Sequence, residues 1–350
     1  MTIYLDHHAS TPIDPLVLDA MLPVLSMPGN PASAHQLGRN ARGSIDQARE
    51  SIAALVMQVP SSVVFCSGAT EANNLAILGT RTLEKRTGVL YGATEHPSVI
   101  APADARNGNR EGRLGVEPDG RLDLDELASR ITADVGLVSV QAANGEIGTL
   151  QPIARIADIV HAAGAILHVD AAQAMVGVKV DGIGQADLVT ISAHKLYGPQ
   201  GLGALIVAPE IRSHLKPLLL GGGQERGLRS GTVSVASVVG FGVAAQIAQA
   251  DRDADCAYLS KLRDQMWSRL QPAGAELNGP SLDQRLPGNL NVRLPADAEA
   301  VMAHAPEVAC STGSACASAS GEPSPVLKAI GLTTEAAEES LRLGVGRGNT

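Results

Sequence analysis

Aromatic residues are scarce in this sequence: one Trp, four Tyr and two Phe make up 2% of its 350 residues. Val, Ile, Leu and Ala must therefore fill the hydrophobic core. Apolar residues account for 45% of the chain and charged residues for 18%, which is typical of a globular protein. The length is sufficient for one large domain with a sizeable core and a second, smaller domain.

The sequence also lacks an excess of positive charge and any long apolar run. Its net charge is −9, which argues against direct nucleic-acid binding because that function requires a basic surface. No apolar run approaches the ~20 residues of a membrane-spanning helix. The first residues, MTIYLDHHASTP, have neither the basic nor the apolar region of a signal peptide. We therefore expect a cytoplasmic protein without a membrane span.

Cysteine pairs with metal-ligand spacing are absent as well. The four cysteines are Cys66, Cys256, Cys310 and Cys316; none forms a C-x-x-C pair, and no Cys/His cluster has the spacing of a zinc site. We expect no metal centre of this kind and no disulfide framework in a cytoplasmic chain. A single cysteine outside such a context is most commonly a small, buried apolar residue.

The stretch LDHHAS (5–10) suggests a different kind of metal site, because an Asp-His-His motif occurs in metal-dependent phosphoesterases. Such a site needs further carboxylates or histidines to complete the coordination shell. In those enzymes other Asp motifs lie upstream, whereas only five residues precede Asp6 here. The sequence therefore favours another role for Asp6, His7 and His8.

Short apolar runs alternate with stretches of helical periodicity. Strands are predicted at 61–66, 87–92, 135–143, 165–170, 187–192 and 202–208. Helices are predicted at 71–85 and 153–164, the second ending at Gly164. This alternation predicts an α/β domain with a mostly parallel sheet. The composition changes near residue 245: one continuous charged helix is expected over 244–270, followed by a smaller α+β unit.

Two segments place groups that could bind a ligand at the ends of strands: the N–H groups of a helix N-terminus and a carboxylate. FCSGATEANNLA (65–76) leads from a strand into a helix whose N-terminal N–H groups would suit a phosphate, although an ordinary capped turn is the alternative. HVDAAQ (168–173) places Asp170 at the end of a buried strand. There it either caps the next helix or holds a cationic group of a ligand.

A third segment, SAHKLYGP (192–199), brings Lys195 to the same edge of the sheet. Burial would lower the pKa of this amine and suit it to forming a Schiff base, and a surface lysine in a turn is the alternative. A phosphate site, a strand-end aspartate and a strand-end lysine are the groups that pyridoxal 5′-phosphate requires of a protein. The lysine binds the aldehyde, and the aspartate keeps the ring nitrogen protonated.

With these motifs in place, the chain resembles the pyridoxal-phosphate-dependent cysteine desulfurases of the NifS/IscS type, within the class V aminotransferase group. SAHKLYGP and STGSACASA are the most specific of the shared motifs. The matching stretches follow the family order and cover nearly the whole chain: YLDHHASTP (4–12), NPASAHQLGR (30–39), SGATEANNLA (67–76), TEHPSV (94–99), NGEIGTLQPI (144–153), HVDAAQ (168–173), SAHKLYGPQGLG (192–203), RSGT (229–232), RLPGNLN (285–291), STGSACASA (311–319) and SLRLGVGR (340–347).

The resemblance implies a fold type I pyridoxal-phosphate transferase. Its large domain, residues 13–245, would hold a mostly parallel seven-stranded sheet between helices. Residues 1–12 and 246–350 would form a smaller α+β domain that carries the loop with the catalytic cysteine.

The resemblance further implies that Lys195 binds the cofactor covalently and moves protons. Asp170 would pair with the ring nitrogen, Gln173 would hydrogen-bond the ring hydroxyl, and His96 would stack on the ring and assist proton transfer. The implied phosphate ligands are Ala69, Thr70, Ser192 and His194.

Two more residues are implied to bind at the edges of the site. Thr232, in RSGT, would reach the phosphate of the neighbouring subunit, which implies a homodimer with shared sites. Arg342, in SLRLGVGR, would bind the substrate carboxylate as a bidentate fork.

Cys316 is the implied sulfur-accepting nucleophile. Its surroundings, ACSTGSACASASGEPS, are small and polar without a core pattern, which predicts an exposed loop with an accessible thiol. Cys310, Cys66 and Cys256 lack this motif position, and Cys66 is expected to be buried on its strand. L-cysteine would yield L-alanine and a persulfide on Cys316, which a sulfur-acceptor protein would receive.

Three features depart from the family pattern. Asn144-Gly145 stands where the family usually has two asparagines, so Asn144 or a water would have to replace the contact of the second. LDHHAS carries histidine where another residue is usual, which leaves open whether His7 or His8 tunes the substrate pocket. The chain stops at RGNT (347–350), where relatives often continue with a tail that helps to dock a scaffold.

Other functions remain as alternatives. The sulfur could serve iron–sulfur cluster assembly, tRNA thiolation or DNA phosphorothioation. Another class V enzyme, such as an aminotransferase, a selenocysteine lyase or a kynureninase-like hydrolase, would share the cofactor site but would not need a thiol on a loop. A non-catalytic sulfur relay would keep only the fold.

Overall fold

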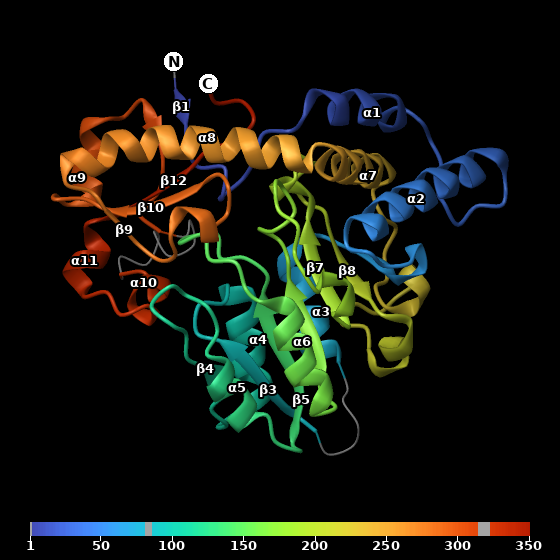
Figure 1. The fold of residues 1–350 in the computed structure, drawn as a ribbon. Coiled ribbons are helices and arrows are strands. Elements are labelled where there is room, and N and C mark those ends of the chain that lie inside the picture. The colour runs from blue at the N-terminus through green and yellow to red at the C-terminus, as the bar shows by residue number, and fades with distance from the viewer. Residues whose placement is uncertain (1, 81–85, 314–322) are drawn as a thin grey trace.

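A computed structural model describes residues 2–80, 86–313 and 323–350. Its main feature is a seven-stranded sheet with the strand order β2-β8-β7-β6-β5-β3-β4 (Figure 1). Neighbouring strands are parallel except at β8, which is antiparallel to both β2 and β7. The predicted mostly parallel sheet is therefore confirmed. The strands are β2 (Val63–Cys66), β3 (Gly88–Gly92), β4 (Arg113–Leu114), β5 (Val135–Gln141), β6 (Ile166–Asp170), β7 (Leu188–Ser192) and β8 (Gly203–Val207).

Helices cover both faces of this sheet. Along β2, Val63 and Phe65 belong to one core cluster and Val64 and Cys66 to the other, as the alternation of side chains along a strand requires. A sheet that is buried on both faces explains why its strands are continuous apolar runs in the sequence. The first cluster includes α1 (Pro15–Leu25), α2 (Gln36–Leu55), α5 (Leu124–Arg130), α6 (Ile153–Ala162) and α7 (Val235–Ala250); the second includes α3 (Ala69–Gly79) and α4 (Pro97–Asn107).

A smaller unit lies beside the large sheet and includes an antiparallel sheet of order β12-β10-β9 (Figure 1). The N-terminal strand β1 (Ile3–Tyr4) pairs with β11 (Val308–Ala309), so the first residues join the C-terminal part of the chain. The domain boundaries expected at 13–245, 1–12 and 246–350 stay a prediction. The remaining elements here are α8 (Arg252–Leu270), β9 (Glu276–Leu277), β10 (Asn289–Arg293), α9 (Ala298–His304), α10 (Pro325–Ala329), α11 (Thr334–Glu338) and β12 (Ser340–Gly344).

All six predicted strands are present, with ends within two residues of those expected. The seventh, β4, has only two residues and therefore gave no periodic signal. The predicted helix 153–164 is confirmed as α6, and Gly164 follows it in a left-handed conformation with φ +68°.

Two predicted helices are wrong in extent. The helix expected over 71–85 ends at Gly79, because Thr80 pairs with Leu215 and a Cβ at Gly79 would lie 2.8 Å from the carbonyl oxygen of Lys216. The continuous helix expected over 244–270 is broken at Asp251, whose φ of −95° and ψ of 7° are not helical. The break separates α7, which packs in the large core, from α8, which packs on the smaller sheet.

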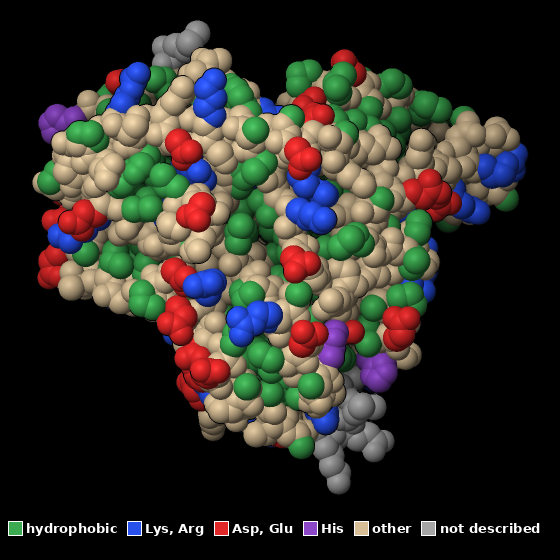
Figure 2. All heavy atoms as spheres, viewed as in Figure 1, with side chains coloured by type: hydrophobic (Ala, Val, Ile, Leu, Met, Phe, Trp, Pro, Cys, Tyr) green, Lys and Arg blue, Asp and Glu red, His purple; other side chains and the backbone are tan. Residues whose placement is uncertain are grey.

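The surface mixes charges of both signs, and apolar side chains gather over α1 (Figure 2). Leu16, Leu22 and Leu25 of that helix are all more than half exposed. Across the described residues, no helix combines the length and the apolar character needed to cross a membrane.

Candidate active site

The strand ends and the loops that follow them enclose a cavity of about 930 Å³. Because parallel strands end at one edge of the sheet, residues far apart in the sequence meet there. The predicted site residues that line this cavity are Ala69, Thr70, His96, Asp170, Gln173, Ser192, His194, Lys195 and Arg342.

The N-terminus of α3 lines the cavity and forms an anion cradle there. Gly68 is its N-cap residue and has no side chain with which to cap the helix, which suits the first N–H groups to an external anion. A Cβ at Gly203 would lie 2.7 Å from the carbonyl carbon of Gly68, so only glycine on β8 lets this loop approach so closely. The buried hydroxyl of Ser192 has no hydrogen-bond partner among the described residues. A phosphate group would supply the missing acceptor.

His194 also lines the cavity and contributes a neutral ring. Burial and the charge of Lys195 lower the pKa of His194 to about 4. Its Nδ1 lies 3.2 Å from the hydroxyl oxygen of Ser10. His194 can therefore donate a hydrogen bond to a phosphate but adds no positive charge near pH 7.

Asp170 ends β6 and lines the cavity with only 7% of its surface exposed. Its Oδ2 accepts a hydrogen bond from Nδ2 of Asn73 at 2.8 Å, and its Oδ1 accepts one from the main-chain N–H of Ala172 at 3.0 Å. Both donors are uncharged. A buried carboxylate with these partners suits a protonated ring nitrogen, which would neutralise it.

His96 is the N-cap of α4, and its Nδ1 accepts the main-chain N–H of Ser98 at 3.1 Å. Burial lowers the pKa of His96 below its ordinary value; Asp170 opposes this shift and Lys195 adds to it. With Nδ1 as the acceptor, the proton of the neutral ring lies on Nε2. This tautomer can donate one hydrogen bond to a group in the cavity.

Lys195 follows β7, and the N-terminal segment of the chain holds its amine. Nζ donates to the main-chain carbonyl of His8 and, at 2.9 Å, to that of Ala9. The hydroxyl of Thr11 donates to the carbonyl of His194 at 2.8 Å and accepts the N–H of Tyr197 at the same distance. Hydrogen bonds with residues 8–11 therefore hold the turn that carries Lys195 in place.

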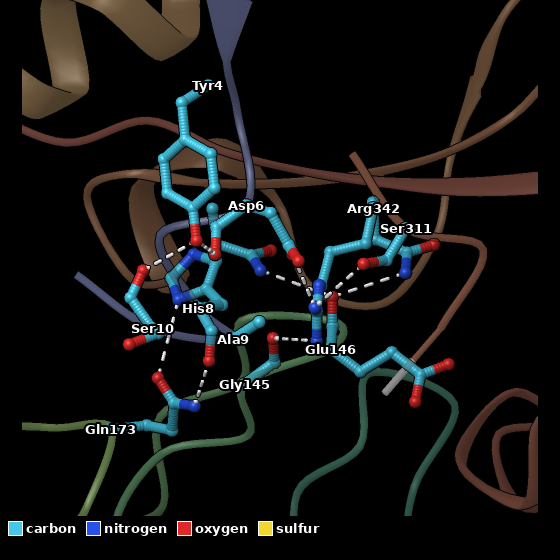
Figure 3. Close-up of polar contacts among 12 residues, drawn as sticks. Tyr4, Asp6, His8, Ala9, Ser10, Gly145, Glu146, Gln173, Ser311 and Arg342 are labelled. Carbon is cyan, nitrogen blue, oxygen red and sulfur yellow. Dashed lines mark hydrogen bonds and ion pairs between the residues drawn. The ribbon is translucent and has the colours of Figure 1, made fainter. Parts of the chain in front are cut away.

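Gln173 also binds this segment (Figure 3). Its Nε2 donates to the His8 carbonyl at 2.8 Å, and its Oε1 lies 3.4 Å from Nδ1 of His8. A Cβ at Gly145 would lie 2.5 Å from Nε2 of Gln173. Gln173 therefore fills the space that a side chain at position 145 would need.

Asn144 is one of the two groups, with a water, that could replace the contact of the missing asparagine, but its amide has other partners. Its Nδ2 donates to the carbonyl of Thr94 at 3.1 Å, and its Oδ1 accepts the N–H groups of Glu146 and Ile147 at 2.8 and 2.9 Å. The Asn144 amide therefore shapes the loop that carries Gly145.

Arg342 lies on β12 with 3% of its surface exposed (Figure 3). Its Nη2 is 2.6 Å from Oδ1 of Asp6 and 3.2 Å from Oγ of Ser311, and its Nη1 is 3.5 Å from the carbonyl oxygen of Gly145. A substrate carboxylate that takes two N–H groups of this guanidinium must share or displace the contact with Asp6.

The three side chains of Asp6-His7-His8 have separate partners. Asp6 pairs with Arg342, and the ring of His7 packs against Tyr4 with centroids 4.9 Å apart. His8 lines the cavity. Burial lowers the pKa of His7 to about 4, and burial with the charges of Arg342 and Lys195 lowers that of His8 to about 3. Both rings are neutral near pH 7, and no metal-binding cluster of His, Cys, Asp or Glu occurs within the described ranges.

The cysteines divide into three described thiols and one position outside the described residues. Cys66 is buried on β2, as expected, and burial raises the pKa of its thiol. Burial also raises the pKa of Cys310, and Cys256 lies on α8. None of these three lines the cavity. Cys316, the predicted nucleophile, lies in 314–322, outside the described residues.

Thr232 is exposed and, within the described part of the chain, lies outside the set of residues that line the cavity. Leu218, Leu219 and Leu220 precede it and are exposed too; Leu220 has 84% of its surface exposed. The chain's own cavity therefore does not use Thr232.

Several residues that orient the site side chains were not predicted from the sequence. Asn73 orients Asp170, and Asp6 with Ser311 orients Arg342. Asn73 lies within the SGATEANNLA stretch, so its place on α3 was a usable signal. The pairing of Asp6 with Arg342 spans 336 positions, and nothing local in the sequence indicates it.

Comparisons with known proteins agree over the full length of the chain. The profile of the family described as aminotransferase class-V matches residues 3–350. A cysteine desulfurase from Frankia sp. (strain EuIK1) is 44% identical and is aligned over 99% of this chain and 87% of its own. The solved structure of a NifS-like protein superposes with a TM-score of 0.89 at 31% identity, covering 100% of this chain and 95% of its own. A structure titled "SspA in complex with cysteine" has a TM-score of 0.85 at 31% identity and covers all of both chains.

Proposed function

This chain belongs to the class-V aminotransferase family, and from that membership we propose how its residues remove sulfur from L-cysteine. Its full-length similarity to cysteine desulfurases makes it a cysteine desulfurase with the fold of the NifS-like proteins, fold type I. The observation that carries the residue assignments is the single cavity that joins an anion cradle, Asp170, His96 and Lys195.

The cofactor of the proposed reaction is pyridoxal 5′-phosphate, as in the family. When bound, it supplies an aldehyde carbon that combines with amines and a ring that accepts electrons from the substrate. The residues of the cavity fit this group: the uncapped α3 N-terminus and the orphaned Ser192 hydroxyl suit the phosphate, and Asp170 suits the ring nitrogen. Lys195 is the amine that binds the aldehyde.

Lys195 and His96 carry protons in this proposal. Lys195 lines the cavity, and its amine donates to two main-chain carbonyls there. Its amine would take the proton from Cα of L-cysteine. Neutral His96 supports proton transfer through Nε2, and Arg342 holds the substrate carboxylate.

The thiolate of Cys316 is the proposed sulfur acceptor, on the strength of the STGSACASA motif. It attacks the substrate sulfur; the new S–S bond forms as the carbon–sulfur bond breaks and the electron pair stays with the carbon skeleton. Protonation of that skeleton yields L-alanine, and Cys316 keeps a persulfide. A sulfur-acceptor protein then removes the outer sulfur.

The decisive experiment compares Cys316→Ala with Cys310→Ala. We expect Cys316→Ala to retain the visible absorption of the bound cofactor but to form no enzyme persulfide and no alanine from L-cysteine. Cys310→Ala, a thiol six positions earlier, should behave as the parent. Full activity of Cys316→Ala would refute the assignment. Preferred turnover of L-selenocysteine, or transfer of the amino group to a keto acid, would favour the alternative class V activities.

A homodimer with shared sites is the proposed assembly. Exposed Thr232 and the exposed leucines at 218–220 support it, because large apolar side chains of this kind commonly lie at interfaces. The cytoplasmic location stays a prediction. The pathway supplied with sulfur, whether cluster assembly, tRNA thiolation or DNA phosphorothioation, is best identified by capturing the protein that takes sulfur from the persulfidated enzyme.

A further inference from the structure

The carboxylate of Glu71 lies at the anion cradle formed by the N-terminus of α3. Glu71 lies in the first turn of α3 and lines the cavity together with Ser67 and Gly68. Its Oε2 accepts the main-chain N–H of Ser67 at 2.7 Å. Glu71 thereby fixes the loop that leads into the helix, but it also brings a negative charge to the place where a phosphate would bind.

This carboxylate is ionised. Burial acts to raise the pKa of Glu71, but the hydrogen bonds from Arg229 and Ser67 together hold it below its ordinary value. A helix N-terminus favours an anion because its N–H groups carry partial positive charge. An unpaired carboxylate in the first turn would itself interact with these N–H groups and would repel a second anion, such as a phosphate, from the helix N-terminus.

Arg229 pairs with Glu71 in a bidentate arrangement. Its Nε lies 2.8 Å from Oε1, and its Nη2 lies 3.3 Å from Oε2. Less than a fifth of either side chain is exposed, so water screens this pair less than a surface pair. Arg229 is not a cavity-lining residue, so any effect it has on a ligand passes through Glu71.

We propose that Arg229 is a positioning residue for the phosphorylated cofactor: it neutralises Glu71, so that this carboxylate can hold the Ser67 loop without repelling the phosphate. The inference rests on the proposed function, since it takes pyridoxal 5′-phosphate as the ligand. It gives Arg229 of the RSGT motif a part in the site of its own chain, separate from the part proposed for Thr232 in the neighbouring one.

The test measures binding of pyridoxal 5′-phosphate to the apo-enzyme by equilibrium dialysis in four proteins: parent, Arg229→Gln, Glu71→Gln and the double variant. We expect Arg229→Gln to weaken binding about tenfold, which corresponds to about 1.4 kcal/mol of repulsion. Glu71→Gln, which keeps a side-chain oxygen for Ser67, should bind at least as tightly as the parent. The double variant should return to near-parent affinity, because no unpaired charge remains.

Two controls separate charge from structure. Pyridoxal, which lacks the phosphate, should bind all four proteins with the same affinity. Arg229→Lys should retain most of the parent affinity for pyridoxal 5′-phosphate because it keeps the charge. A double variant as weak as Arg229→Gln, or an equal loss of pyridoxal binding, would overturn the inference and assign Arg229 to folding of its segment. A parent enzyme that binds neither compound would overturn the proposed cofactor as well.

Discussion

At the scale of single residues, Gly145 determines where the Gln173 amide can lie. A Cβ at this position would meet the far end of the Gln173 side chain, 2.5 Å from Nε2, and that end can swing away. We therefore expect Gly145→Ala to fold with a free energy of unfolding within about 1 kcal/mol of the parent. It should, however, displace Gln173 from the His8 carbonyl and raise KM for L-cysteine.

A double-mutant cycle with Gln173→Ala tests this coupling. If the glycine acts through Gln173, Gly145→Ala changes KM in the parent and has little further effect once Gln173 is an alanine. Effects that add in full would show that the two positions act independently.

His7 and His8 are adjacent but should respond differently to replacement. His8 lines the cavity, whereas His7 is buried beside Tyr4, and a Cβ at Gly346 would lie 2.2 Å from its Nδ1. We expect His8→Asn to change KM for L-cysteine several-fold with little change in stability. His7→Asn should lower the free energy of unfolding by about 1–3 kcal/mol, change turnover modestly and leave cofactor binding intact.

Urea denaturation and steady-state kinetics on both variants check this assignment. Loss of the cofactor's visible absorption in His7→Asn, or a larger change of KM there than in His8→Asn, would contradict it.

The sequence predicted Asp170 because it ends an apolar strand, and Lys195 because it lies in the turn just after one; strand ends form the ligand edge of such a sheet. It could not predict that the His8 carbonyl accepts hydrogen bonds from both Lys195 and Gln173, since every residue has a main-chain carbonyl and the amino-acid type does not show which one is used. Partners of this kind become visible only when distant segments are placed together.

At the scale of elements, β6 carries a buried histidine between its two neighbours. His168 bonds through Nδ1 to Ser139 on β5 at 2.8 Å and through Nε2 to Thr190 on β7 at 3.0 Å. Burial lowers its pKa to about 4, so the folded state keeps this ring neutral. An unfolded chain protonates the same ring near pH 6.5.

The sign of the resulting pH dependence follows from proton uptake. Between pH 6.5 and 4 the unfolded state binds a proton that the folded state does not. The contribution of His168 is therefore complete above about pH 6.5 and declines as the pH falls toward 4, by as much as about 3 kcal/mol. In His168→Asn we expect lower stability at pH 7 but a shallower decline in acid.

Urea denaturation of the parent and His168→Asn at several values between pH 7.5 and 4.5 measures that slope. Parallel stability curves for the two proteins would show that His168 does not contribute to the acid sensitivity.

Sequence patterns located most strands correctly but missed a break between two helices. Continuous apolar runs located the six longer strands, because each of these strands is buried on both faces. The break at Asp251 was missed because it needs no proline or glycine. It arises where α7, packed in the large core, gives way to α8 on the smaller sheet.

At the scale of the whole molecule, the proposed homodimer makes a prediction about mixed subunits. Thr232 and Leu220 are exposed in one chain, and Thr232 does not contribute to that chain's described cavity. If Thr232 completes the phosphate site of the neighbouring subunit, Thr232→Ala should weaken cofactor binding in its homodimer. Lys195→Ala should abolish turnover in its own subunit but still supply an intact Thr232 to the other.

A heterodimer of Thr232→Ala and Lys195→Ala, co-expressed with two different affinity tags and purified through both, therefore contains one complete site. That site has its own Lys195 and receives Thr232 from the partner. At cofactor concentrations that leave the Thr232→Ala homodimer largely empty, the heterodimer should show about half of the parent's turnover per dimer. If the threonine served only its own chain, the heterodimer would be as poorly loaded as that homodimer, because its one lysine-bearing subunit would lack Thr232. Cofactor affinity and alanine production in the purified heterodimer distinguish these outcomes.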